Sequence, residues 1–219
     1  MKTSSFYSFL FLFLFPAYLF AEKTLSNGFI FPDFKQGVVT LKNGSNLAGE
    51  LNYYYVNQKM LFRDNGKINE FAEPASVVAV TIDGRLFINV GNGTFYEQVP
   101  AGDGFYYIQW FAKVIGGGKG VAYGGYSGLS SVKTMGSFND GGGNYGNLKL
   151  NEKYETEIKC NYYLNIKNKY KRIDSANALD KLFKGHEAEI ESFVKEQNID
   201  FEKSSDIAKV AEFCNKFLK

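Results

Sequence analysis

Residues 37–99 alternate between apolar and polar side chains with a period of two, and this pattern constrains the fold more than any other feature of the chain. Val78, Val80 and Ile82 form one such run, which ends at the turn pair Asp83-Gly84. Asn-Gly pairs separate other runs at positions 43–44, 65–66 and 92–93. Alternation interrupted by such pairs is typical of antiparallel hairpins. We therefore expect an antiparallel β meander that buries one face as a curled sheet, a small sandwich or a roll.

The last third of the chain changes from strand to helix spacing. Strand character returns at 154–164 and at 170–173, on either side of a turn near 167–168. Ser175 then resembles a helix N-cap, and apolar residues recur at helical spacing up to Phe217. Ser204 or Ser205 is predicted to cap a third helix. The whole chain is therefore predicted to be α+β, with about three short C-terminal helices packed on the sheet.

A glycine-rich stretch separates these two parts. Between Gly116 and Gly146 there are 12 glycines in 31 residues. Such a stretch has too few apolar side chains to offset the entropy lost when its backbone is ordered. We therefore divide the chain into a signal segment (1–21), a β-rich body (22–114), a flexible loop (115–148) and a hairpin with helices (149–219).

The first 21 residues have the pattern of an export signal. Lys2 precedes an apolar run of Phe and Leu, Pro16 breaks it, and Ala21 offers a cleavage site before Glu22. An uncleaved anchor is the alternative, but the apolar stretch of 15 residues is shorter than the about 20 needed to span a bilayer. We expect the protein to be exported, to the periplasm, the outer membrane or the extracellular space, with no transmembrane segment in the mature chain.

Charge and motif content exclude several function classes. Removing Lys2 leaves 24 Lys and Arg against 23 Asp and Glu, so the basic excess that nucleic-acid binding requires is missing. Gly116–Gly120 lacks the spacing of a phosphate-binding loop. Two cysteines and the lone His186 lack zinc-site spacing. No cofactor and no metal are expected.

Cys160 and Cys214 are the only cysteines. Export makes a disulfide between them chemically possible. Both also lie in apolar patterns, where Cys serves as a small buried side chain. The sequence leaves a bridge and two free thiols as alternatives.

Runs of tyrosine are the candidate binding residues. They occur at 53–55, 106–107 and 162–163, and neighbours in a strand point to opposite faces. Tyr54, Tyr107 and Tyr163 could therefore form an exposed aromatic surface for a glycan or a peptide. The alternative is ordinary cross-strand packing.

No catalytic residue can be assigned. His186 lies between two expected helices, and the match to Ser-x-x-Lys at Ser130–Lys133 lacks its companion motifs. Paired carboxylates would support a hydrolase, and the candidates for such a pair are Asp33, Asp64, Asp83, Glu97 and Asp103.

Several segments resemble a group of uncharacterised exported proteins of Bacteroidota. The similarity lies in the turn before Gly44, the Leu51-Asn-Tyr-Tyr strand, the Met60-Leu-Phe strand and Lys119-Gly-Val-Ala-Tyr-Gly124. The resemblance implies a Gram-negative envelope location and carries no catalytic residue. Asp174-Ser-Ala176 also resembles the O-glycosylation sequence of Bacteroidota, which makes Ser175 either a modification site or a helix cap.

These observations together favour a non-enzymatic envelope protein that interacts with another envelope protein. A glycan- or peptide-binding module that uses the tyrosines is the alternative, and a carboxylate-based hydrolase is the third hypothesis.

Overall fold

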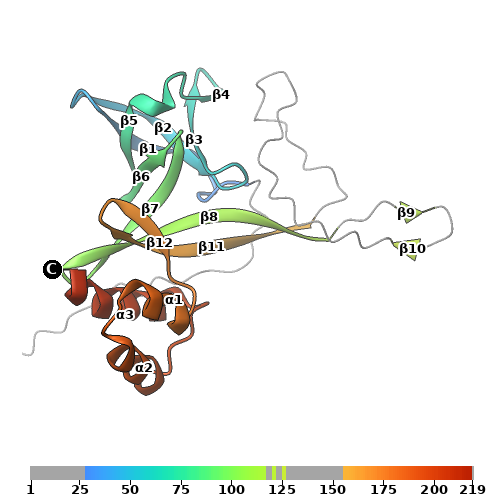
Figure 1. Ribbon diagram of the computed structural model, residues 1–219. Coiled ribbons are helices and arrows are strands. Elements are labelled where there is room, and N and C mark those ends of the chain that lie inside the picture. The colour runs from blue at the N-terminus through green and yellow to red at the C-terminus, as the bar shows by residue number, and fades with distance from the viewer. Residues whose placement is uncertain (1–27, 117–119, 122–124, 127–154, 219) are drawn as a thin grey trace, which may run out of the picture.

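A computed structural model describes residues 28–116, 120–121, 125–126 and 155–218. It confirms the α+β class: an open ten-stranded antiparallel sheet precedes three C-terminal helices (Figure 1). The strands of the sheet are β1 (Lys35–Leu41), β2 (Asn46–Tyr54), β3 (Lys59–Asp64), β4 (Lys67–Glu70), β5 (Val77–Ile82), β6 (Arg85–Gly91), β7 (Thr94–Ala101), β8 (Gly104–Gly116), β11 (Glu155–Ile166) and β12 (Lys169–Arg172). The helices are α1 (Ala176–Leu182), α2 (Glu187–Glu196) and α3 (Ser204–Asn215), and 3₁₀ turns lie at Pro74–Ser76 and Lys216–Leu218.

The hairpin turns have the backbone that their residue types favour. Asp83 and Gly84 have φ angles of 50° and 75°, and Asn92 and Gly93 have 52° and 71°. Two consecutive positive φ values define the turn whose twist matches paired strands, and Asn, Asp and Gly tolerate them best. The turn pairs of the sequence therefore place the hairpins correctly.

The sheet departs from a simple meander at one connection. Its order is β12-β11-β8-β7-β6-β5-β1-β2-β3-β4, so β5 pairs with β1 and not with β4. The chain returns across residues 71–76, where the side-chain amide of Asn89 donates to the carbonyls of Pro74 and Val77, both at 2.8 Å. Because of this crossing, β4 is one edge of the sheet. The other edge is β12.

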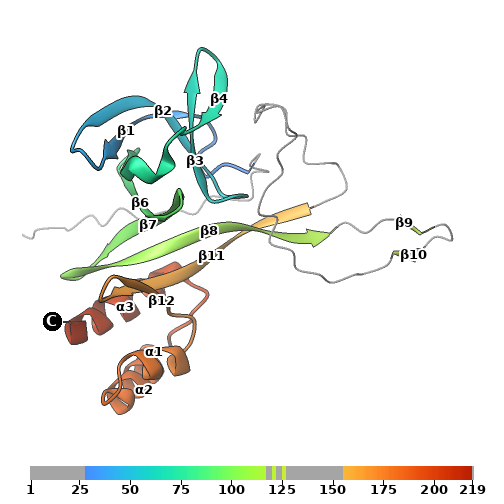
Figure 2. The same cartoon turned by 45° about the horizontal axis from the view of Figure 1, so that its top comes forward.

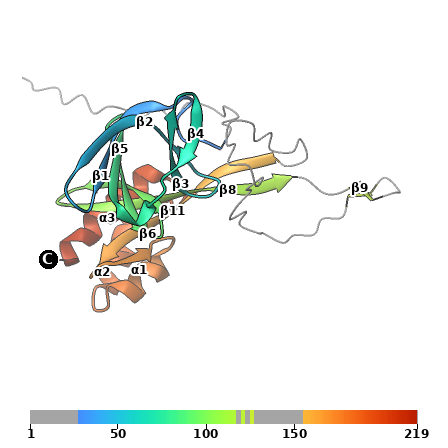
Figure 3. The same cartoon turned by 90° about the horizontal axis from the view of Figure 1, so that it is seen from above.

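Strands β1 to β7 curl around the first hydrophobic core (Figures 2 and 3). Tyr53 and Phe87 stack at its centre with ring centroids 5.3 Å apart, and both are fully buried. The N–H of Phe95 donates to the carbonyl of Gln58 at 3.3 Å, which joins the start of β7 to the turn between β2 and β3. The curl therefore brings a distant hairpin turn beside the middle of the sheet.

The helices form a second core against one face of β7, β8 and β11 (Figure 1). Ile207, Val210 and Cys214 of α3 are fully buried there. Trp110 of β8 packs against both cores. The sheet and the helices consequently share one continuous interior.

One of the two predicted helix caps is correct. The Ser175 hydroxyl accepts the N–H of Ala178 at 3.2 Å, which confirms it as the N-cap of α1. The prediction for the third helix is wrong, because Lys203 occupies the N-cap of α3 and no side chain caps it. Ser204 begins the helix, and its hydroxyl lies 3.4 Å from that of Tyr106.

The predicted loop of residues 115–148 lies mostly outside the described residues. β8 continues to Gly116, two residues into that range. Two-residue strands, β9 (Gly120–Val121) and β10 (Gly125–Tyr126), pair with each other. The signal segment of residues 1–21 also lies outside the described part. Among the helices that are described, none is long and apolar enough to cross a bilayer.

Candidate functional site: a tyrosine–amide face

Four tyrosines from four strands meet on the sheet face opposite the helices. Tyr163 of β11 lies directly across from Tyr107 of β8, and residues that are directly opposite share a face. Tyr96 of β7 is two residues from Gln98, the cross-strand partner of Tyr107, so alternation puts Tyr96 on the same face. Tyr170 of β12 lies opposite Asn165, which is two residues from Tyr163 on β11, so Tyr170 shares this face.

The four rings contact one another in sequence. The ring centroids of Tyr96 and Tyr163 are 5.0 Å apart in a stacked arrangement. Tyr170 meets Tyr96 at 5.5 Å and Tyr107 at 4.9 Å, both edge to face. Such arrangements are the favoured ones for aromatic pairs, so the rings hold each other in place.

Amide side chains connect the hydroxyl groups of this cluster. The Gln109 carbonyl oxygen accepts the Tyr163 hydroxyl at 2.8 Å and the Asn161 amide at 3.0 Å. The Gln109 amide donates to the side-chain oxygen of Gln58 at 2.7 Å. Asn165 lies directly opposite Tyr170 in the strand pair, and its side chain is beside the Tyr107 and Tyr170 hydroxyls. We name these eight residues the tyrosine–amide face: Gln58, Tyr96, Tyr107, Gln109, Asn161, Tyr163, Asn165 and Tyr170.

Gln58 reaches this face from a strained turn. Its φ angle is 61°, in the left-handed region that non-glycine residues rarely occupy. Its backbone carbonyl accepts the N–H of Phe95, and its side chain accepts from Gln109. Local strain held by surrounding contacts is concentrated at functional sites.

The electrostatics of the face are those of neutral hydroxyl and amide groups. Burial raises the pKa of Tyr96, and the neighbouring Tyr163 raises it further. Burial also raises the pKa of Tyr107 and of Tyr170. These hydroxyls therefore stay protonated throughout the physiological range, as hydrogen-bond donors and acceptors without charge.

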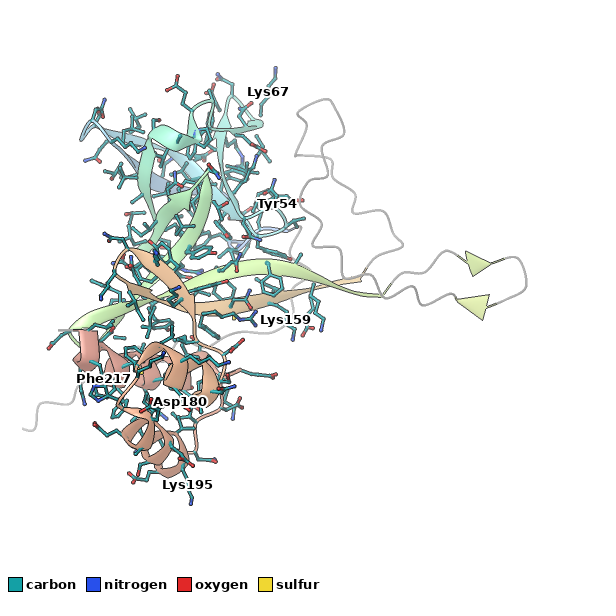
Figure 4. All side chains as sticks on the ribbon, viewed as in Figure 1. Tyr54, Lys67, Lys159, Asp180, Lys195 and Phe217 are labelled. Atoms are coloured by element: carbon teal, nitrogen blue, oxygen red, sulfur yellow. The ribbon has the colours of Figure 1, made fainter. Side chains whose placement is uncertain are left out.

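The structure brings together two of the three predicted binding tyrosines. Tyr107 and Tyr163 are cross-strand partners, although Tyr107 is only 9% exposed. Tyr54 is elsewhere, 4% exposed in the curled part of the sheet (Figure 4), with its ring 5.0 Å from that of Phe29. The prediction that Tyr54 belongs to an exposed aromatic surface is therefore wrong, because Gly28 and Phe29 pack against it.

Sequence reasoning missed Tyr96, Tyr170 and the amides. Tyr96 and Tyr170 are single tyrosines outside the tyrosine runs, and their place depends on strand register. Only the pairing of Asn165 with Tyr170 across the turn at 167–168 could have been predicted from the sequence, because that turn is short and local.

Glu97 is the buried member of the predicted carboxylates, and its oxygens are already engaged. Arg85 donates to both of them, through Nε at 2.7 Å and Nη2 at 2.5 Å, and the Trp110 indole donates to Oε2 at 2.7 Å. The guanidinium also lies over the rings of Phe31, Phe87 and Trp110. This arrangement supports a structural ion pair and not a free acid.

The remaining candidate residues lie apart from the face. Cys160 is half-buried and Cys214 fully buried, and both are free thiols, so the disulfide alternative is not realised in the structure. Burial raises the pKa of Cys214 to about 12 and raises that of Cys160. The His186 ring stacks on Phe217 with centroids 4.1 Å apart.

Within the described residues, no group of three or more His, Cys, Asp or Glu side chains is arranged to hold a metal ion. The chain matches no protein-family model, and comparisons with curated proteins and with solved structures find no match either.

Proposed function

We propose that this chain is an exported, non-catalytic binding protein that recognises a protein of the cell envelope through its tyrosine–amide face. The observation that carries the proposal is the gathering of four tyrosines from four strands into one hydrogen-bonded cluster. Export is supported by the pattern of residues 1–21.

The composition of the face suits a protein partner. Tyrosine supplies a large, rigid contact area at low cost in side-chain entropy, and amide side chains supply adaptable hydrogen bonds. Aromatic residues are enriched and charged residues depleted at the centres of protein interfaces. Each of the eight residues of the face is a tyrosine, an asparagine or a glutamine.

The internal contacts of the face support tight recognition. Tyr163 is fixed by Tyr96 and by Gln109, and Tyr170 is fixed by the rings of Tyr96 and Tyr107. A surface whose side chains are already ordered loses less entropy when it binds. The strained Gln58 turn holds one end of the network in the same way.

The test compares variants in capture from an envelope extract of the producing organism. Tyr170→Ala removes the ring between Tyr96 and Tyr107, and Tyr163→Phe removes only a hydroxyl. Phe71→Ala is the matched control, since Phe71 stacks on Phe62 in another part of the molecule. The captured protein is identified, purified and titrated against each variant.

We expect Tyr170→Ala to weaken that interaction about 30-fold, equivalent to about 2 kcal/mol for a tyrosine at an interface centre. Tyr163→Phe should weaken it less, and Phe71→Ala should leave it unchanged. Equal binding by all variants would overturn the proposal. Binding to a neutral glycan array that depends on Tyr170 would replace the protein partner with a glycan.

A further inference from the structure

β11 has an open edge in the described structure. Its inner side pairs with β8 from Glu155 to Tyr163. Its outer side pairs with β12 only over Tyr163–Ile166, with one further bond from the N–H of Ile173 to the carbonyl of Tyr162. Residues 155–161 of the outer edge therefore have no partner strand among the described residues, and β8 and β11 project together beyond β7 and β12 (Figures 1 and 2).

The bond at Tyr162 determines which backbone groups point outward along this edge. The N–H and C=O of one residue point to the same side of a strand, and the side alternates from residue to residue. Since the carbonyl of Tyr162 points toward β12, the backbone groups of Cys160 and Ile158 point outward too. Ile158 is also the midpoint of the open window of residues 155–161.

The side chains around Ile158 complement their own two-fold copy. An antiparallel pair centred on Ile158 sets Ile158 opposite Ile158 of a second copy and exchanges both backbone hydrogen bonds. Within one copy Glu157 and Lys159 form an ion pair, with Oε1 and Nζ 3.1 Å apart. In the dimer Glu157 of each copy also lies opposite Lys159 of the other, and opposite charges across a strand pair stabilise it. Ile158 is 41% exposed, and Lys159 lies on the projecting ribbon (Figure 4).

The corresponding edge of β8 is less open. The carbonyl of Trp110 accepts the Tyr53 hydroxyl at 3.4 Å, and the Gln109 side chain is bonded to Gln58. These contacts from the curled part of the sheet lie beside β8 where a further strand would have to pair. Between these two strands, the outer edge of β11 is the more open one among the described residues.

We propose that two copies of this chain associate through the outer edges of their β11 strands, antiparallel and with the two-fold axis at Ile158. A two-fold axis between antiparallel strands is perpendicular to the sheet, so both tyrosine–amide faces lie on the same side of the joined sheet. The dimer then presents two copies of its binding face to one side, which multiplies the apparent affinity for a partner that is itself repeated. Dimerisation is measured without any partner and is thus independent of the proposed function.

Charge reversal tests the register. Sedimentation equilibrium of the purified exported chain should show a dimer. Glu157→Lys and Lys159→Glu should each raise the dissociation constant by about tenfold or more, because symmetry turns two attractive pairs into two repulsive ones. The double variant Glu157→Lys/Lys159→Glu should restore the dimer. Lys67→Glu at the exposed end of β4 is the matched control and should leave the dimer unchanged.

Two substitutions at Ile158 test the backbone pairing. Ile158→Pro removes an outward N–H that β8 does not use, and proline is tolerated at sheet edges, so the variant should be a folded monomer by circular dichroism. Ile158→Cys should form a disulfide between two copies under oxidation, since paired Cα atoms at this position are about 5.5 Å apart. A native chain that is monomeric at its highest soluble concentration would overturn the proposal. The proposal would also be overturned if the Ile158→Pro variant were still a dimer. It would likewise be overturned if the double variant Glu157→Lys/Lys159→Glu failed to form the dimer again.

Discussion

Glu97 and Arg85 show how one residue's role depends on its surroundings. In the sequence, Glu97 is one of five carboxylates considered for a catalytic pair, and no neighbouring residue distinguishes it from the other four. In the fold its side chain is 9% exposed and held by Arg85 and Trp110. A buried carboxylate is tolerated because its charge is paired and its oxygens are hydrogen-bonded.

We expect Arg85→Met to destabilise the protein by about 3 kcal/mol, because it leaves the Glu97 carboxylate buried without its cation. Adding Glu97→Gln to that variant should recover at least half of the loss, since the unpaired charge is then gone. The free energy of unfolding from denaturant titration measures both.

Arg172→Met is the control for this ion pair, because Arg172 and its partner Asp174 are both exposed. We expect it to cost less than about 1 kcal/mol, as is usual for surface pairs. Equal losses at Arg85 and Arg172 would contradict a structural role for the buried pair.

Among the elements, a bulge in β6 decides which residues of β6 share a face with Tyr96 of β7. The two-residue turn at Asn92-Gly93 sets Gly91 opposite Thr94, and unbroken pairing would continue to Ile88 opposite Glu97. The structure instead pairs Ile88 with Tyr96, because the register shifts by one residue between Asn89 and Gly91. A shift of one residue exchanges the two faces of a strand. The bulge thus sets Phe87 opposite Glu97, on the face of the sheet away from Tyr96.

Asn89 stabilises this bulge. Its side-chain oxygen accepts the N–H of Gly91 at 3.0 Å, and its amide donates to the carbonyls of Pro74 and Val77. One side chain therefore ties the bulge of β6 to the segment that leads into β5. The sequence contains no local sign of these contacts, because Asn before Val90-Gly91 is also an ordinary turn residue.

We expect Asn89→Ala to destabilise the protein by about 2 kcal/mol, because three hydrogen bonds are lost and two carbonyls lose their side-chain donor. Asn69→Ala is the matched control, since the Asn69 amide makes one exposed bond, to the carbonyl of Lys67. It should change the free energy of unfolding by less than about 0.5 kcal/mol. A small effect of Asn89→Ala would show that the bulge is fixed by packing alone.

At the scale of the whole molecule, Trp110 joins the curled sheet to the helices. It packs against both hydrophobic clusters and is the only tryptophan of the chain. Its fluorescence therefore reports on the junction. Shared burial of this kind favours one cooperative unfolding transition.

We expect Ile207→Ala in α3 to destabilise the protein by about 3 kcal/mol, because Ile207 is fully buried and a cavity replaces it. The transition of Trp110 fluorescence and the transition of helical circular dichroism should move together to lower denaturant concentration. Ala208→Gly on the same helix is the control for lost helix propensity, and it should lower the free energy of unfolding by about 1 kcal/mol. A fluorescence midpoint that stays in place while the helices melt earlier would contradict a shared interior.

Local sequence signals were sufficient to predict most of the strands and helices of this protein. Its period-two alternation and its Asn-Gly and Asp-Gly pairs located the hairpins, and the Ser175 cap located α1. These signals are local, since they depend on backbone preferences within a few residues. Contacts between distant residues fix the pairing of β5 with β1, the bulge that sets Phe87 on the face away from Tyr96, and the hydrogen bond between Gln58 and Gln109. Register and strand order depend on contacts between residues far apart in the chain, so only the assembled sheet shows which tyrosines share a face.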